Sequence, residues 1–399
     1  MDTKELLETG GKHLMAFTKR APVALVRGEG MRVWDSDGKE YLDFTGGIAV
    51  TALGHSHPRV VGTIREQATT LLHVSNLFHI PQQTHLAKLL CEHSFADRVF
   101  FSNSGAEANE AAIKLARKWA KEHGASDRGD IITMRGGFHG RTLATVTATA
   151  QEKYHHGFEP LPGGFKYVPF NDLRAVERAI DSRTAGIMVE PIQGEGGVNI
   201  PDDGYLPGLR KLCDEAGLCL IFDEIQTGMG RTGRLWGYEH SGVAPDVMTV
   251  AKALANGVPI GATLATDQVA AAFSPGTHGS TFGGNPFATA VGLTVLTTLI
   301  EERLPERSER MGRLLLAELE KVRARRSGAV KALRGRGCLV GIDLTPPVAD
   351  VLAACRERGL LVLTAGDNTL RLAPSLVLDE KDVARGVAII DEALSAAGG

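Results

Sequence analysis

The sequence lacks the features that mark secreted, membrane-spanning or nucleic-acid-binding proteins. Its 399 residues include only five cysteines, an odd number without a CxxC pair, which is typical of reduced thiols and not of a disulfide framework. The 44 Lys and Arg residues against 47 Asp and Glu residues leave a net charge of −3, so no basic excess would attract nucleic acid or anionic lipid. The first residues do not resemble a signal peptide, and the longest weakly polar run, 286–300, is too short to cross a bilayer. We therefore expect a cytoplasmic protein.

Glycine, by contrast, is abundant, and the hydrophobic pattern is that of an α/β protein. The chain has 47 glycines, about 12% against a usual value of about 7%, which predicts many tight turns. Between residues 57 and 271, short apolar segments alternate with helical patterns, which predicts a mostly parallel sheet covered by helices on both faces. The expected strands are 98–101, 131–134, 167–170, 186–189, 219–222, 247–250 and 261–265.

The two ends of the chain predict a second, smaller α/β domain. We expect a short helix in the first 20 residues, strands at 23–27, 31–34 and 41–44, a long helical region at 287–325 that breaks near Pro305, and a C-terminal module. That module has strands at 339–344, 360–364 and 369–372 and helices at 348–358 and 381–397. The expected plan is an N-terminal segment of the small domain (1–50), a large domain (51–285), and a linking helix with the C-terminal small domain (286–399).

One turn has the composition of an anion-binding site. A strand ends near residue 101, and Ser104, Gly105 and Ala106 lead into a helix. Free N–H groups and the positive end of the helix dipole favour phosphate at such a turn. An ordinary capping box between Ser104 and Glu107 explains the same residues.

An acid and a lysine follow two other apolar strands. Asp223 ends the segment 219–222, and Lys252 follows the segment 247–250. Ligands bind at the carboxyl ends of parallel strands, and a buried lysine has the depressed pKa that a Schiff-base amine requires. Taken singly, Asp223 could be a helix cap and Lys252 a surface lysine. Together with a phosphate-binding turn, they suit pyridoxal 5′-phosphate (PLP).

Several motifs occur in the order found in one enzyme family. The chain resembles the class III, fold-type I PLP-dependent aminotransferases over nearly its whole length, and within them those that act on acetylornithine. The motifs are Gly54-His55-Ser56-His57-Pro58, Ser104-Gly105-Ala106-Glu107-Ala108-Asn109, Phe138-His139-Gly140-Arg141, 190–197 (EPIQGEGG), Asp223-Glu224-Ile225-Gln226, Lys252 and 281–286 (TFGGNP).

The resemblance implies roles for particular residues toward PLP. Lys252 would form the Schiff base and shuttle the proton, Asp223 would pair with the ring nitrogen, and Gln226 would bond the phenolic oxygen. Phe138 would stack on the ring, although it could equally be a core residue. The phosphate would be held by Ser104, Gly105 and Ala106, and by Thr281 of the neighbouring subunit of a homodimer.

The resemblance also implies substrate-binding residues. Arg141 would bind a substrate carboxylate, and Arg371 the α-carboxylate of glutamate or 2-oxoglutarate, although either arginine could be a surface ion pair. We expect Glu195 to neutralise Arg371 while the amino donor is bound, and Ser280 to contact the substrate. A static structural role for Glu195 is the alternative.

The expected reaction is transfer of the terminal amine of N2-acetylornithine to 2-oxoglutarate. Ile48 stands where ornithine aminotransferases carry tyrosine, and Phe138 where 4-aminobutyrate aminotransferases usually carry tyrosine. Thr51, Ala373 and Ser375 depart from the acetylornithine pattern, so both relatives stay open as alternatives. A PLP-dependent aminomutase or decarboxylase on the same fold is a further alternative.

Two motifs are interpreted as turns. Residues 228–233 spell GxGxxG, but they do not directly follow a strand or precede a helix pattern, which argues against a dinucleotide site. His55 and His57 lack further ligands at metal spacing, so no metal site is expected.

Overall fold

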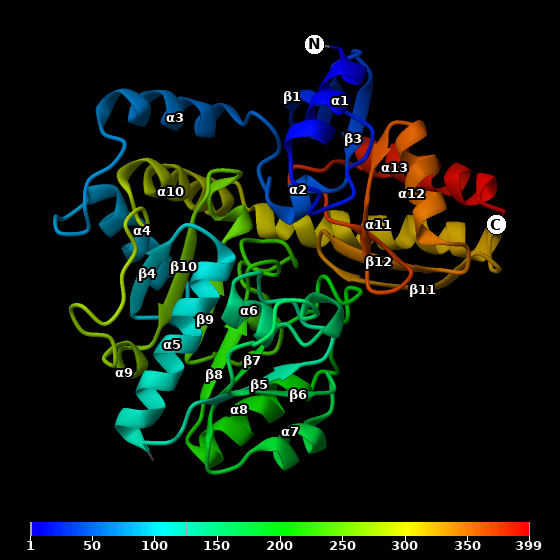
Figure 1. Cartoon of the computed structure of the whole chain (residues 1–399). Coiled ribbons are helices and arrows are strands. Elements are labelled where there is room, and N and C mark those ends of the chain that lie inside the picture. Colours follow the sequence, from blue (N-terminus) through cyan, green and yellow to red (C-terminus); the bar gives the residue numbers. More distant parts are fainter. Residues whose placement is uncertain (1, 125, 399) are drawn as a thin grey trace.

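The large sheet has seven strands and lies in the centre of the molecule (Figure 1). The computed structural model describes residues 2–124 and 126–398. The strand order is β4-β10-β9-β8-β7-β5-β6, and only β10 runs antiparallel to its neighbours. The strands are β4 (Arg98–Ser102), β5 (Asp130–Met134), β6 (Phe165–Val168), β7 (Thr184–Val189), β8 (Cys219–Asp223), β9 (Val247–Val250) and β10 (Gly261–Ala265). The expected α/β class is therefore confirmed, although β6 begins two residues before the expected 167–170.

Helices cover both faces of this sheet, as the apolar runs predicted. Ile131 packs into a cluster with α5, whereas its neighbour Ile132 packs into a separate cluster with α7 and α8. Met188 and Ile187 divide between the two clusters in the same way, because successive side chains of a strand point to opposite faces. The covering helices are α5 (Gly105–His123), α6 (Leu143–Ala148), α7 (Leu173–Ala179), α8 (Tyr205–Ala216) and α9 (Asp267–Ala270).

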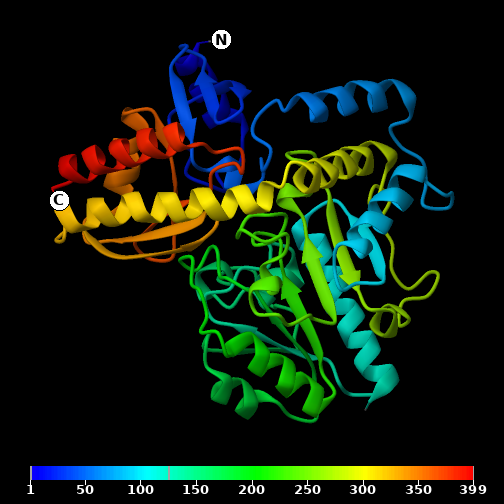
Figure 2. The ribbon, with the colours of Figure 1, turned by 180° about the vertical axis from the view of Figure 1, so that it is seen from behind.

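Two smaller sheets lie above the large one, and one of them joins both ends of the chain (Figure 2). Its order is β1-β2-β3-β13, with β3 parallel to β13 through the pairs Leu42–Leu360 and Asp43–Leu361. Its strands are β1 (Leu25–Glu29), β2 (Arg32–Asp35), β3 (Glu40–Asp43) and β13 (Leu360–Leu361). The other sheet has the order β11-β12-β15-β14, with β11 (Val330–Arg336), β12 (Leu339–Leu344), β15 (Thr369–Leu372) and β14 (Leu363–Ala365).

Two expectations for the C-terminal module were wrong. The expected single strand 360–364 is two short strands, β13 and β14, because the chain crosses from one sheet to the other at Val362. The strand β11 had no counterpart among the expected elements. Its alternation is weak, since every residue after Val330 is only half-buried or exposed.

Long helices connect the sheets. The helical region 287–325 is broken as expected, with α10 (Pro286–Glu301) and α11 (Leu304–Arg325) separated at Arg303, which has φ of +52°. Helices α3 (Pro58–Thr70) and α4 (Pro81–Glu92) pack on α10, and α12 (Val348–Glu357) and α13 (Glu380–Ala396) pack on each other.

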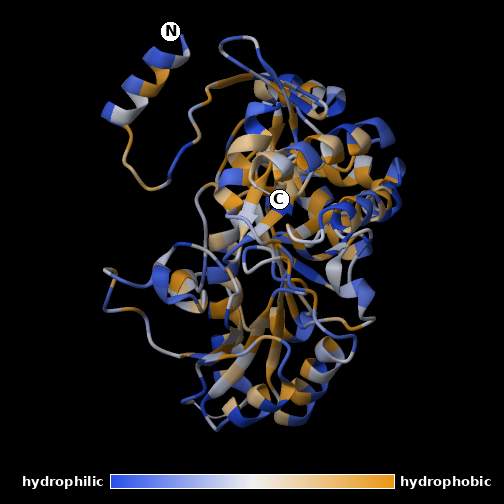
Figure 3. Cartoon of the chain, turned by 90° about the vertical axis from the view of Figure 1, so that its right-hand side faces the viewer, coloured by the Kyte–Doolittle hydropathy of each residue, from blue (hydrophilic) through white to orange (hydrophobic). Residues whose placement is uncertain are grey.

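The short helix expected in the first 20 residues is α1 (Thr3–His13), and it buries none of its residues. Figure 3 shows it projecting from the rest of the chain, while the apolar strands of the large sheet lie inside. In the part of the chain that the structure describes, no helix combines the length and apolarity needed to span a membrane.

Candidate active site

The carboxyl ends of β8 and β9 bring the predicted acid and lysine together. Asp223 is the last residue of β8 and pairs in register with Thr249 of the parallel neighbour β9. Lys252 begins the short helix η3 (Lys252–Ala255) directly after β9, with φ of +42°. Both side chains line a cavity of about 410 Å³, together with the predicted residues Ser104, Gly105, Ala106, Phe138, Arg141 and Gln226.

The turn after β4 forms one wall of this cavity. Ser104 is the N-cap of α5, and its Oγ accepts a hydrogen bond of 3.2 Å from Glu107 N, while Glu107 Oε2 accepts one of 2.7 Å from Asn103 N. Only half of the expected capping box is formed, because the Glu107 side chain bonds the N–H of Asn103 and not that of Ser104. The cap leaves the N–H groups of Gly105 and Ala106 available, since the first N–H groups of a helix have no partner within it. A Cβ on Gly105 would lie 2.7 Å from Ile225 Cδ1, so a larger residue would disturb this cradle.

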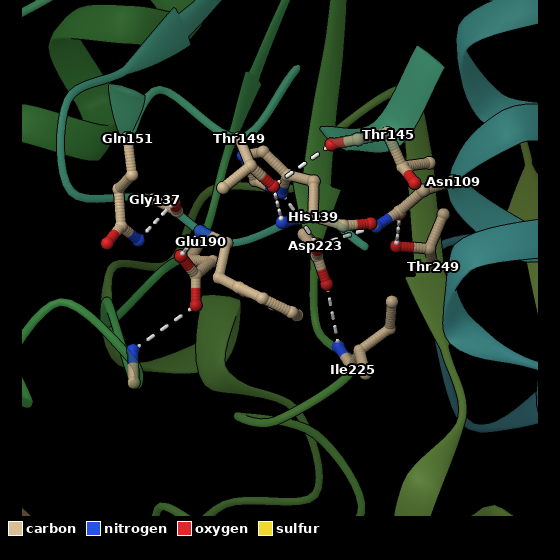
Figure 4. Close-up of polar contacts among 12 residues, drawn as sticks. Asn109, Gly137, His139, Thr145, Thr149, Gln151, Glu190, Asp223, Ile225 and Thr249 are labelled. Atoms are coloured by element: carbon tan, nitrogen blue, oxygen red, sulfur yellow. Dashed lines mark hydrogen bonds and ion pairs between the residues drawn. The ribbon is translucent and has the colours of Figure 1, made fainter. Parts of the chain in front are cut away.

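Asp223 is buried and held by three donors (Figure 4). Its side chain is only 3% exposed, and its Oδ2 accepts hydrogen bonds of 2.8 Å from both Asn109 Nδ2 and His139 Nδ1. Its Oδ1 accepts one of 3.1 Å from Ile225 N. These three donors fix the orientation of the carboxylate.

Burial and neighbouring charges shift the pKa of Lys252. Burial lowers the pKa of Lys252, and the Arg371 guanidinium lowers it further, although the carboxylates of Glu195 and Asp223 act in the opposite direction. A lysine with a lowered pKa is more often neutral and hence nucleophilic.

Arg371 and Glu195 form a pair next to Gln226, which lines the cavity. Arg371, in β15, is 2% exposed, and its Nη1 donates to Glu195 Oε1 at 2.6 Å and to Gln226 Oε1 at 3.1 Å. Burial alone would raise the pKa of Glu195, but the Arg371 guanidinium and the Lys252 ammonium hold it below its usual value. The pair that we expected between Glu195 and Arg371 is thus formed in the structure, and Gln226 is its additional partner.

Aromatic side chains surround the other arginine. The guanidinium carbon of Arg141 lies 3.7 Å from the ring centroid of Tyr154 and 5.3 Å from that of Phe138. The two rings meet edge to face, with centroids 6.1 Å apart. Arg141 is exposed, so a carboxylate entering the cavity can reach it from solvent.

Four predicted site residues are not among those that line the cavity: Glu195 and Arg371, which are joined to it through Gln226, and Ser280 and Thr281, which lie on another loop. Asn103, at the rim, donates to Ser280 Oγ at 3.3 Å, and Asn76 Nδ2 donates to the carbonyl of Ser280 at 3.0 Å. Thr281 itself is exposed.

Sequence reasoning assigned no role to several side chains around the site. Asn109, His139 and Glu190 support the cavity wall, and each lies inside a motif quoted above, which was the available signal. Tyr154 lies in the short helix η1 (Glu152–Tyr154), outside the quoted motifs, and no sequence pattern indicated that it belongs to the site.

The segment 228–233 and the histidines His55 and His57 were both interpreted as parts of turns. In 228–233, Met229 and Gly230 adopt φ of +57° and +86°, and the next element is the short helix η2 (Gly237–His240), so the strand-to-helix geometry of a dinucleotide site is missing from this segment. His55 Nε2 pairs with Asp43 Oδ2 at 2.8 Å, and His57 precedes α3.

The chain is similar to known aminotransferases over nearly its whole length. It is 50% identical over 382 residues to the acetylornithine aminotransferase of Myxococcus xanthus, covering 96% of this chain and 95% of that protein. Its fold matches the acetylornithine aminotransferase of Elizabethkingia anophelis with a TM-score of 0.89 at 34% identity, covering 99% and 100% of the two chains. It matches a Toxoplasma gondii ornithine aminotransferase structure described as having partial occupancy of PLP at the active site, with a TM-score of 0.95 at 35% identity, covering 99% and 95%.

The fold and the cavity together define a PLP-type transferase site. The family model described as Aminotransferase class-III matches residues 15–394, and the chain belongs to this family. The protein is thus an aminotransferase whose cofactor is PLP. Its own residues fit that group, because one cavity offers an anion cradle at α5, a buried and hydrogen-bonded carboxylate and a lysine with a lowered pKa.

Proposed function

We propose that this aminotransferase moves the terminal amino group of N2-acetylornithine to 2-oxoglutarate, giving N-acetylglutamate 5-semialdehyde and glutamate, a reaction of arginine biosynthesis. The observation that carries the proposal is that Lys252, Asp223 and the N-terminus of α5 line one cavity. The substrate assignment is supported by the 50% identity to the Myxococcus xanthus acetylornithine aminotransferase.

The residues of the chain divide the work on the cofactor. When bound, PLP supplies an aldehyde carbon that accepts the amino group and a ring that withdraws electrons from the carbon losing a proton. The N–H groups of Gly105 and Ala106, with Ser104, would hold the phosphate. Asp223 would hold the proton on the ring nitrogen, Gln226 would bond the phenolic oxygen and Phe138 would pack on the ring. Lys252 Nζ would remove the proton from the amine-bearing carbon of the donor and, in the second half-reaction, would deliver a proton to the corresponding carbon of the oxo acid.

The two arginines explain how one cavity takes two unlike substrates. N2-acetylornithine carries one carboxylate, which Arg141 binds at the mouth, whereas glutamate carries two and also needs Arg371. While the donor is bound, Arg371 stays neutralised by Glu195 at 2.6 Å, which avoids a costly unpaired buried charge. Glutamate displaces Glu195 and takes its place.

We further propose a homodimer with shared active sites. Leu77, Phe78 and Phe282 are 87%, 67% and 59% exposed, and they belong to two loops that Asn76 joins through its bond of 2.9 Å to Gly283 O. Exposed apolar residues gathered on adjoining loops indicate a protein interface. In the dimer, Thr281 reaches the phosphate and Ser280 the substrate of the partner's site.

The remaining assignments concern organisation and location. We propose that residues 51–285 form the PLP-binding domain, and that 1–50 and 286–399 form the small domain, which is supported by the pairing of β3 with β13. The five free cysteines support a cytoplasmic location.

Amino-transfer rates test the proposal. The purified protein is incubated with 2-oxoglutarate and, separately, N2-acetylornithine, ornithine or 4-aminobutyrate. We expect N2-acetylornithine to have the highest kcat/KM and glutamate to form in equal amount. A preference for either other donor would replace the substrate assignment. An isomeric amino acid formed without 2-oxoglutarate would indicate an aminomutase and overturn amino transfer.

A further inference from the structure

A fully buried histidine lies directly behind the acid of the site. The side chain of His139 is 0% exposed, and its Nδ1 lies 2.8 Å from Asp223 Oδ2 (Figure 4). A carboxylate can only accept a hydrogen bond, so Nδ1 carries the proton and donates it. This bond fixes one oxygen of the Asp223 carboxylate from the side of the ring.

The orientation of the neighbouring amide is fixed by its partners. Asn109 Nδ2 lies 2.7 Å from the carbonyl oxygen of His139, which can only accept, so this atom is the nitrogen. Its second proton therefore goes to Asp223 Oδ2 at 2.8 Å, and Asn109 Oδ1 accepts from Thr249 Oγ1 at 2.7 Å. Asp223 is thus held from behind by two side-chain donors whose polarity the network determines.

The backbone of His139 is anchored as well. Its N–H donates to Thr149 Oγ1 at 2.8 Å, and Thr149 Oγ1 donates in turn to Thr145 O at 2.9 Å. These bonds keep the ring in place against Asp223.

A second carboxylate faces the other side of the ring. His139 Nε2 is buried and has no hydrogen-bond partner among the described residues, and a Cβ on Gly137 would lie 3.3 Å from it and 3.6 Å from Glu190 Oε2. Glu190 is itself held by Phe138 N at 2.9 Å and Gly194 N at 3.2 Å. Burial alone would lower the pKa of His139, but the bond to Asp223 and the charges of Asp223 and Glu190 raise it above its usual value.

We propose that His139 is a positioning residue for the aminotransferase reaction: through Nδ1–H it holds the Asp223 carboxylate in the orientation in which Asp223 can pair with a protonated ring nitrogen. This inference rests on the proposed role of Asp223 toward PLP. His139 acts through its bond to Asp223, so its effect is expected at the ring nitrogen.

That route makes the inference testable with a cofactor analogue. The experiment measures the equilibrium affinity of the apoprotein for PLP and for 1-deazapyridoxal phosphate, in which carbon replaces the ring nitrogen. We expect His139→Leu to weaken PLP binding by about tenfold or more, the effect of losing a hydrogen bond to a charged group, and to change analogue binding little. His139→Asn, which can place an amide N–H near the position of Nδ1, should recover most of the affinity for PLP.

Two further variants show how large and how small a change in the preference for PLP over the analogue can be. Asp223→Asn should abolish the preference for PLP over the analogue. His155→Leu is the structural control, because His155 Nε2 bonds only backbone carbonyls, those of Val146 and Thr149, in the same segment. It should leave the preference unchanged.

Equal losses for the two compounds in His139→Leu, or a His139→Asn protein no better than His139→Leu, would overturn the inference. Its failure is distinguishable from failure of the proposed function: if the wild-type protein showed no preference for PLP that Asp223→Asn removes, the role of Asp223 itself would be wrong.

Discussion

Arg371 Nη1 and Glu195 Oε1 lie 2.6 Å apart although 176 residues separate them in the chain. Arg371 is fixed in the buried strand β15, whereas Glu195 lies in the loop after β7 and keeps 24% of its side chain exposed. The carboxylate is therefore the partner with room to move. The ion pair can therefore open by movement of the Glu195 side chain.

The first prediction is that Glu195→Gln separates the two half-reactions. It removes the charge that neutralises Arg371, so amino transfer from N2-acetylornithine should slow by about tenfold or more, while transfer from glutamate is spared or improved. Single-turnover absorbance changes of the bound cofactor measure each half-reaction. Asp391→Asn, which breaks an ion pair with Arg325 on the far helices, is the matched control. Equal losses in both half-reactions would mean that Glu195 does not switch.

The second prediction concerns the covalent attachment of the cofactor. We expect borohydride to bleach the visible absorbance band of the loaded protein and to leave the cofactor mass on the peptide containing Lys252. Lys252→Ala should bind PLP without becoming labelled. Peptide mapping by mass spectrometry gives the position, and a label on any other lysine would contradict the assignment.

The sequence alone predicted the large sheet and its two helical layers well, because continuous apolar runs between helical patterns have few other interpretations. It predicted the small domain less well. The strand β11 has too little alternation to be recognised, and the change of sheet at Val362 depends on what the two halves of the segment pair with.

The sequence also predicted some residues of the site better than others. Asp223 and Lys252 were predicted from their places after apolar strands, and Arg371 and Glu195 only from resemblance to a family. The contact between His139 and Asp223 joins residues 84 apart and depends on how a loop folds back over β8. No local pattern in the sequence encodes such a contact.

The third prediction tests the shared active site. Lys252→Ala and Thr281→Ala chains are each impaired, but in a hybrid dimer one site combines an intact Lys252 with an intact Thr281 of the partner. Random mixing makes half of the dimers hybrid, so about one quarter of the sites should recover at limiting PLP. If Thr281 served its own chain, mixing would restore no site and the activity would stay at the average of the two variants.

The fourth prediction concerns stability and pH. Glu224 is buried beside the site and accepts hydrogen bonds from Gly237 N at 2.8 Å and Tyr238 N at 2.7 Å. Burial raises the pKa of Glu224 from 4.5 to about 7. The folded protein therefore binds more protons than the unfolded chain between these values, and the free energy of unfolding falls as the pH rises from about 4.5 to about 7.

Glu224→Gln should reduce this pH-dependent loss of unfolding free energy by on the order of 3 kcal/mol, whatever its effect on absolute stability. Urea unfolding at several pH values measures the slope. Glu239→Gln is the control, since Glu239 is an exposed carboxylate of the same loop that also accepts a backbone N–H, from Trp236. Parallel slopes for the wild type and Glu224→Gln would contradict the prediction.

The pairing of β3 with β13 has a consequence for how the protein is made. Lys39 beside β3 donates to the carbonyl of Glu357, 318 residues further along, so the N-terminal ribbon cannot finish its sheet until β13 has left the ribosome. Closing so long a loop is a late and slow event. Arg371 is synthesised later still. A chain that stops before β15 therefore carries Lys252 and Arg141 but lacks Arg371, so it has the reactive amine without the residue proposed to bind the second carboxylate of glutamate.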